Sequence, residues 1–268
     1  MGGEPSNIKN TCAHVLCIFI FDTTMERNHV RACQTKISHP QKMKVRYMMD
    51  YIKQYYDDLA FQYDKLRFEN SYGQYVDTLE RSVLSSLLEN SDPKDNLEIA
   101  CGTGRLLDFA STGVDSSENM LRMARAKYPY ANLIKASFEE TPFRDNSFSN
   151  IYAFHLLMHL NESKVQDFSN EAMRLLKDDG RLIVDVPSHF RRRFQRKRKH
   201  WHGSYSPHIT LFECWGWKIT KVHPIMFVPI HRVQKEFRKS FIPLERVLSS
   251  LLPTACASYT ILEMRKLR

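Results

Sequence analysis

The sequence lacks a hydrophobic run long enough to span a bilayer. The strongest apolar run, Val15–Phe21, is much shorter than the roughly 20 residues that a membrane-crossing helix needs. It has neither a basic leader nor a clear small-residue cleavage site, so it does not resemble a secretory signal. We interpret it as part of a buried or non-native tail.

Paired cysteines are also lacking. The chain has six cysteines and no C-x-x-C pair, which indicates neither a disulfide framework nor a zinc site. Their scatter favours reduced thiols and a cytoplasmic location. The cysteines are Cys12, Cys17, Cys33, Cys101, Cys214 and Cys256.

The composition allows one large α/β domain with an extension. The chain has 268 residues, and 43% of them are hydrophobic, which is enough for a sizeable core. Its net charge of +9 indicates an anionic partner. A phosphate-bearing substrate, a membrane surface and nucleic acid all fit that charge.

A short apolar run ending in Gly-x-Gly organises the chain. Residues 97–100 predict a buried parallel strand that meets a tight turn at Gly102 and Gly104. We expect a helix to begin at about Arg105 and to point its free N–H groups at a ligand. The third glycine of a dinucleotide fingerprint is absent, because Leu107 stands at its position.

Two acidic residues make this pattern more specific. Glu98 lies inside the first strand, and Asp115 ends the next apolar stretch. The motifs at residues 97–104 and 113–120 closely resemble those of class I (Rossmann-like) S-adenosylmethionine-dependent methyltransferases of the small-molecule type. The resemblance implies a doubly wound, seven-stranded, mostly parallel sheet with N-terminal lid helices, and S-adenosylmethionine as cofactor.

The resemblance also implies roles for individual residues. Gly102 and Gly104 would pack under the methionine part of the cofactor, and Glu98 would orient the loop or the amino group. Asp115 would accept hydrogen bonds from both ribose hydroxyls, and Tyr63 would donate one to the carboxylate. Ser137 replaces the aspartate that usually meets adenine, with the backbone of Phe138 as an alternative. The predicted cofactor-binding residues are Tyr63, Glu98, Ala100, Gly102, Thr103, Gly104, Asp115, Ser116, Met120, Ser137, Phe138 and Phe154.

The rest of the chain follows this family plan. We expect residues 1–42 to be a poorly ordered extension and residues 43–268 to be the methyltransferase domain. That domain would comprise lid helices (47–88), a cofactor half (94–187) and a substrate-recognition insert (188–214). Further predicted elements are a helix capped by Ser117 and running to Tyr128, strands at 133–136, 148–154, 181–187 and 217–228, a helix at 162–176, a turn at 177–180, a helix broken at Pro243 (233–252), and an antiparallel strand at 258–264.

Two histidines after the fourth strand are the candidate catalytic residues. An imidazole titrates near neutral pH and suits a general base. Their spacing of four would place both on one helical face, with His155 lining the cofactor pocket and His159 acting as the base. Ordinary buried histidines and a two-histidine metal site are the alternatives. No third ligand at metal spacing is evident, so we predict no metal.

The most basic stretch, residues 191–199, has three interpretations. It is a solvated loop, a phosphate-binding segment for a substrate or lipid headgroups, or an RNA-binding segment. The Asn-Pro-Pro-Tyr signature of base methyltransferases is absent after the fourth strand, which favours a small-molecule acceptor, apolar or phosphate-bearing. We predict methyl transfer to an oxygen, nitrogen or carbon of that acceptor. The alternative is a non-catalytic cofactor-binding module associated with RNA or, peripherally, with a membrane.

Overall fold

The computed structural model describes residues 50–188 and 207–267. The predicted extension at 1–42 and the basic run at 191–199 lie outside these described residues. Met48–Arg268 form one compact unit. The division of that unit into lid, cofactor half and insert stays a prediction.

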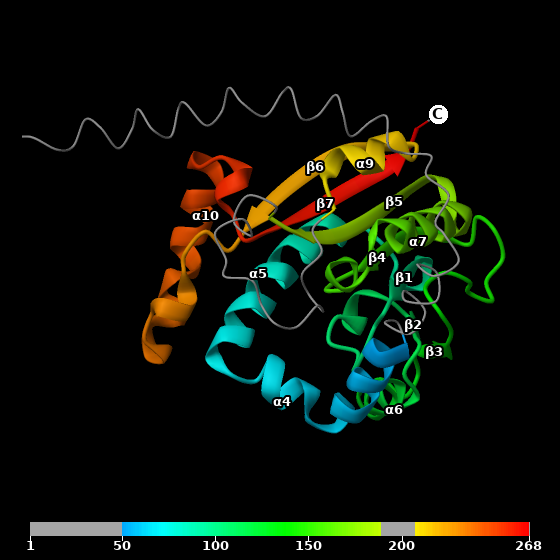
Figure 1. The fold of residues 1–268 in the computed structure, drawn as a ribbon, viewed down its shortest axis with the longest axis horizontal. Helices are drawn as coiled ribbons and strands as arrows, with labels where there is room; N and C mark the ends of the chain where they lie inside the picture. The colour runs from blue at the N-terminus through cyan, green and yellow to red at the C-terminus, as the bar shows by residue number, and fades with distance from the viewer. Residues whose placement is uncertain (1–49, 189–206, 268) are drawn as a thin grey trace, which may run out of the picture. The chain divides into compact units, whose positions relative to one another are not determined.

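Seven strands of the described part form one sheet in the order β3-β2-β1-β4-β5-β7-β6 (Figure 1). Strand β7 runs antiparallel to β5 and β6, and the other pairs are parallel. The predicted doubly wound, mostly parallel sheet is confirmed. The strands are β1 (Asn96–Ile99), β2 (Thr112–Asp115), β3 (Asn132–Lys135), β4 (Phe148–Ala153), β5 (Leu176–Pro187), β6 (Trp217–Ile225) and β7 (Tyr259–Lys266).

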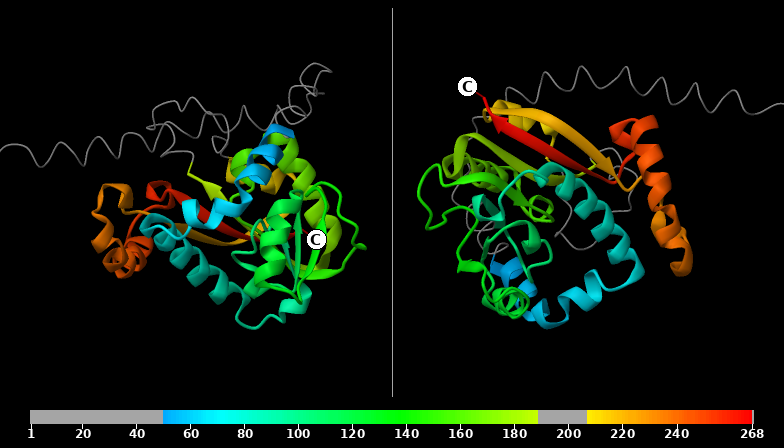
Figure 2. Two further views of the ribbon diagram at one scale, coloured as in Figure 1. Left: turned by 90° about the horizontal axis from the view of Figure 1, so that it is seen from below. Right: turned by 180° about the vertical axis from the view of Figure 1, so that it is seen from behind.

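Helices cover both faces of this sheet, as views from two further sides show (Figure 2). Side chains of α7 (Glu162–Leu175) join one core cluster with Leu97 and Ile151. Side chains of α5 (Ser71–Leu88) join a second cluster with Tyr152 and Ile183. Tyr152 follows Ile151 in β4, and the side chains of successive strand residues point to opposite faces of the sheet. Helices on both faces explain why β1 is buried at every position and β4 at all but one.

The remaining helical elements mostly match the prediction. Ser117 caps α6 by accepting a hydrogen bond from the backbone N–H of Met120, as its position predicts. In residues 50–188 and 207–267, no helix combines the length and the apolar character needed to cross a membrane. The helical elements other than α5 and α7 include a helix at 50–59, η2 (Ala60–Gln62), α4 (Tyr63–Arg67), α6 (Glu118–Lys127), α9 (Ile209–Cys214), η7 (Lys235–Phe241) and α10 (Ile242–Leu251).

The prediction of a helix that begins at Arg105 is wrong. The chain forms a series of turns after Gly102, then the single 3₁₀ turn η4 (Leu107–Phe109), and β2 begins at Thr112. A 3₁₀ turn advances about 2.0 Å per residue against about 1.5 Å for an α-helix. The connection from the glycine turn to β2 therefore contains this 3₁₀ turn in place of the expected α-helix.

One smaller prediction is also wrong. The turn expected at 177–180 lies inside β5, because Leu176 already pairs with Phe148 across a register shift. The predicted helix broken at Pro243 is confirmed, because η7 ends at Phe241 and α10 begins at Ile242. Pro243 occupies the first turn of α10, where a missing N–H removes no helical hydrogen bond.

Candidate cofactor and acceptor cavity

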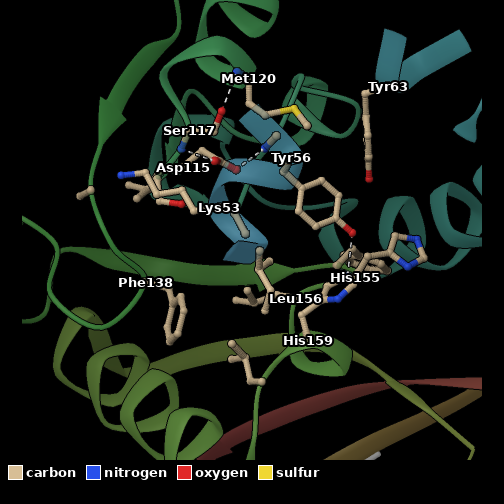
Figure 3. A pocket seen from close by; sticks show the side chains of 18 residues that line it. Lys53, Tyr56, Tyr63, Asp115, Ser117, Met120, Phe138, His155, Leu156 and His159 are labelled. Atoms are coloured by element: carbon tan, nitrogen blue, oxygen red, sulfur yellow. Dashed lines mark hydrogen bonds between the residues drawn. The ribbon is translucent and has the colours of Figure 1, made fainter. Parts of the chain in front are cut away.

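An open cavity of about 820 Å³ lies at the carboxyl ends of β1, β2 and β4 (Figure 3). Strand order reverses at β1, and ligands of doubly wound sheets bind at such a point. The N-terminal helices contribute Ile52, Lys53, Tyr56 and Tyr63 to the wall. The sheet and its loops contribute Ala100, Gly102, Val114, Asp115, Ser116, Ser117, Met120, Ala136, Phe138, Phe154, His155, Leu156, His159 and Leu160.

Asp115 holds the glycine turn in place. Its Oδ2 accepts a hydrogen bond from the backbone N–H of Gly102 and its Oδ1 accepts one from Ser117, both at 2.8 Å. Burial raises the pKa of Asp115, although these backbone donors act in the opposite direction. Each oxygen of a carboxylate has two acceptor sites. Asp115 can therefore fix the turn and still accept hydrogen bonds from a ligand.

Gly102 leaves room for a ligand against the main chain. Its φ is +54°, and a Cβ built on it would meet no atom within 4 Å. Gly104 is different, because at φ +77° a Cβ would approach Leu107 Cδ1 at 2.9 Å. The first glycine thus opens the cavity, whereas the second allows close packing behind the turn.

Two residues other than glycine adopt left-handed backbone beside the cavity. Ala100 follows β1 and His155 follows β4, each with a φ of 59°. Such a conformation costs on the order of 1–3 kcal/mol and persists where the surroundings enforce it. Both residues line the cavity, so the strain is concentrated at the candidate site.

The two candidate histidines do not share a helical face, and that prediction is wrong. His159 lies in the 3₁₀ turn η5 (Leu157–His159), while His155 precedes it in the left-handed conformation. The hydroxyl of Tyr56 lies 2.9 Å from Nε2 of His159 (Figure 3). Burial raises the pKa of Tyr56, so its hydroxyl keeps its proton, and the tautomer of His159 determines which of the two groups donates.

His155 lies between two buried carboxylates. Its Nε2 is 2.9 Å from Glu80 Oε1, and its Nδ1 is 3.6 Å from Asp185 Oδ2. Its backbone N–H also donates to Asp185 Oδ1 at 2.7 Å. Burial lowers the pKa of His155, but attraction to both carboxylates outweighs it and raises that pKa above the ordinary value.

Glu80 connects this histidine to Arg105, whose Nη2 donates to Glu80 Oε2 at 2.6 Å. Burial opposes ionisation of Glu80, yet His155 and Arg105 together lower its pKa to about 2. Ligand atoms of Glu80, His155 and Asp185 lie within 4.8 Å of one another, a spacing that would also suit a metal ion. The two ring nitrogens face different carboxylates, however, which suits an imidazolium better. The prediction of no metal stays a prediction.

Two aspartates join the N-terminal helices to the cavity. Asp57 accepts hydrogen bonds from the Ser117 hydroxyl at 2.5 Å and the Asn119 amide at 3.0 Å. Asp64 accepts from the Thr103 hydroxyl at 2.6 Å. The prediction did not assign these contacts, although the repeated Tyr-Asp pairs at 56–57 and 63–64 mark both positions.

Most of the predicted cofactor residues line the cavity, and four do not. Glu98 is buried inside β1, and its Oε2 has no hydrogen-bond partner. The Thr103 hydroxyl donates a hydrogen bond to Asp64. Gly104 packs behind the turn, and Ser137 is exposed. The roles assigned to these four residues, and to those lining the cavity, stay predictions. The prediction missed the lining residues Ile52, Lys53, Tyr56, Val114, Ser117, Ala136, Leu156 and Leu160, of which Ile52 and Tyr56 share a helical face at a spacing of four.

The open α/β sheet, the glycine turn after β1 and the acidic residue ending β2 define a nucleotide-type cofactor-binding domain of the doubly wound class. Residues 97–184 match the model of a family described as a methyltransferase domain. Residues 97–184 are therefore a methyltransferase domain of the class I, S-adenosylmethionine-dependent type, and S-adenosylmethionine is the cofactor of such domains.

Individual proteins agree with this assignment. Demethylmenaquinone methyltransferase of Thermotoga maritima is 33% identical over 138 residues, which cover 48% of this chain and 58% of that protein. A crystal structure of a SAM-dependent methyltransferase of the same organism, described as a possible histamine N-methyltransferase, is 19% identical. It superposes with a TM-score of 0.56 and covers 82% of this chain and 99% of the other.

The same fold also occurs in a protein named for other chemistry. The [4+2]-cyclase SpnF superposes with a TM-score of 0.57 at 16% identity, covering 81% of this chain and 96% of that one. Likeness at this identity shows the fold alone. The chain spans 51% and 59% of the length of two curated relatives that it matches.

Proposed function

We propose that this protein transfers a methyl group from S-adenosylmethionine to a small, largely apolar acceptor that loses a proton from a hydroxyl or an acidic carbon. The observation that carries this proposal is the Tyr56–His159 hydrogen bond at the wall of the cavity that also contains Asp115 and the glycine turn. One cavity thus offers both a cofactor-binding turn and a group that can accept a proton.

The residues present fit the cofactor. Gly102 leaves its main chain open, and Asp115 keeps free acceptor sites for hydroxyl groups. Tyr63 is a protonated donor at the cavity wall, since burial raises its pKa to about 12. We assign the ribose to Asp115, the carboxylate end to Tyr63 and the adenine to Met120 and Phe138. S-adenosylmethionine supplies an electrophilic methyl group when it is bound.

The acceptor would occupy the part of the cavity near the N-terminal helices. Ile52, Leu156 and Leu160 make its wall apolar, and Lys53 adds a cation. Demethylmenaquinone methyltransferase, a relative named for an apolar ring substrate, is consistent with an acceptor of this kind. The wall would hold the acceptor in line with the methyl group and exclude water from it.

His159 would take the acceptor's proton. In the tautomer that serves as the base, His159 carries its own proton on Nδ1, and Nε2 accepts from the Tyr56 hydroxyl. The acceptor hydroxyl or carbon acid would replace the Tyr56 hydroxyl at Nε2 and transfer its proton there. The deprotonated acceptor would take the methyl group from S-adenosylmethionine as the sulfur–methyl bond breaks, which would leave S-adenosylhomocysteine. His159 becomes an imidazolium and returns the proton to water after product release.

Calorimetric titration with S-adenosylmethionine and S-adenosylhomocysteine tests the cofactor half of this proposal. A panel of quinols and phenols then tests turnover. We expect His159→Gln to lose turnover and to keep its affinity for S-adenosylhomocysteine, while His231→Gln, at an exposed histidine, stays active. An active His159→Gln variant would exclude His159 as the base. Cofactor binding without turnover on any acceptor would favour the non-catalytic alternative.

A further inference from the structure

The segment formed by η7 and α10 is firmly attached to the domain through one face. Ile242 and Leu248 pack against the core cluster that contains Tyr75. The buried carboxylate of Glu245 accepts hydrogen bonds from the Tyr75 hydroxyl at 2.7 Å and from the backbone N–H groups of Phe227 and Val228 at 2.8 and 2.9 Å. The inner face of α10 is therefore fixed, and so is the direction of its outer face.

That outer face is apolar and exposed. Leu244, Val247 and Leu251 follow one another at spacings of three and four, which places them on one stripe of α10. Val247 is 51% exposed and Leu251 is 72% exposed. Phe237 of η7 is 57% exposed, and Leu252 directly follows the helix and is exposed as well. Clustered apolar side chains at a surface are typical of a site that contacts a partner or a membrane.

Exposed cations occur in the same segment of the chain. Arg232, Lys235, Lys239 and Arg246 are exposed in this part of the chain, and the exposed acid among residues 230–252 is Glu236. The other acid, Glu245, is buried and engaged by its three donors. The outer surface of this segment therefore combines apolar side chains with a positive charge.

We propose that this surface, formed by residues 232–252, docks on an anionic lipid bilayer. An interfacial helix inserts its apolar face among the acyl chains while its Lys and Arg side chains meet anionic headgroups. A nucleic acid would satisfy the cations and leave the Leu and Val stripe against a polar backbone. Helix α10 contacts β6, the edge strand of the sheet (Figures 1 and 2), and the side chains of its outer stripe are exposed.

Cosedimentation of the full chain with phosphatidylcholine vesicles, with and without phosphatidylglycerol, tests the proposal. We expect binding to the anionic vesicles that weakens as salt is added. The double variant Val247→Asp with Leu251→Asp should abolish it. Tyr130→Asp, at an exposed aromatic residue after α6, is the matched control and should bind as the original chain does.

A second pair of variants tests the charges. Each cation near an anionic surface accounts for about a fivefold change in partitioning. Lys239→Gln with Arg246→Gln should therefore weaken binding by about 25-fold. Lys94→Gln with Arg144→Gln, at exposed cations elsewhere, should not weaken it.

Three results would overturn the proposal. Both α10 variants could bind the vesicles as tightly as the original chain, which would assign binding to another segment such as residues 191–199. Vesicles without phosphatidylglycerol could bind equally well. Sedimentation could instead show a dimer that Val247→Asp with Leu251→Asp disperses, which would make the stripe an interface between two copies of this chain.

Discussion

Replacement of Glu80 by glutamine tests the buried charge cluster beneath the cavity. Glu80 is 1% exposed and binds Arg105 through one oxygen and His155 through the other. Glutamine has nearly the same size but no charge, so Arg105 would keep only its pairing with Asp77, and His155 only Asp185. Removal of one member of a buried ion pair is strongly destabilising because the partner charge stays buried.

The pKa of Glu80 sets the size of this effect. A decrease in pKa from the ordinary value of 4.5 to about 2 corresponds to about 3 kcal/mol of folding free energy, at about 1.4 kcal/mol per pH unit. Because the folded pKa is lowered, this stabilisation is complete above pH 4.5 and is lost as the pH falls toward 2. The raised pKa of His155 acts in the opposite sense. Its contribution is complete below the ordinary value of 6.5 and is lost as the pH rises through the folded pKa.

Urea unfolding from acidic to neutral pH measures this contribution. We expect Glu80→Gln to lower the free energy of unfolding by about 3 kcal/mol between pH 4.5 and 6.5. The difference should shrink toward pH 2. Glu118→Gln is the control, because Glu118 pairs with Arg125 at the surface and should matter little. A Glu80→Gln difference that does not vary with pH, or that equals the control, would refute the assignment of charges in this cluster.

Two further variants test the glycine turn. Asp115→Asn should weaken S-adenosylhomocysteine binding at least tenfold in calorimetry, because charge-assisted hydrogen bonds of about 1.5–3 kcal/mol each are lost; unchanged affinity would exclude the ribose assignment. Gly104→Ala should lower the unfolding free energy by roughly 1–3 kcal/mol, since its φ is +77° and its Cβ would lie 2.9 Å from Leu107. A Gly104→Ala protein as stable as the original in urea would show that the turn relaxes.

The sequence could predict what lies close together in the chain. The strand before the glycine turn and the Ser117 cap each depend on a local pattern, and both are present. The antiparallel last strand, which the family resemblance implies, is present as well. The absence of an α-helix after Gly104 was not predictable from the motif alone.

Side-chain partnerships between distant segments could not be predicted. Tyr56 and His159 are 103 residues apart, and no spacing rule connects them. Glu80 looks like an ordinary helical glutamate in the sequence, and only the packing of α5 on the sheet brings it to His155. For the same reason, sequence inspection found most of the lining residues near the glycine turn and missed those contributed by the helix at 50–59.

The way the N-terminal helices are held favours the predicted lid role for the helix at 50–59. That helix buries Ile52 and is otherwise fixed mainly by polar contacts, those of Tyr56 with His159 and of Asp57 with Ser117. Each such hydrogen bond stabilises the closed position by only about 0.5–1.5 kcal/mol net, because water can replace the partner. Helix α5 instead buries eight residues and the Glu80 charge pair. We therefore predict that a ligand enters the cavity by displacing the first helix while α5 stays in place.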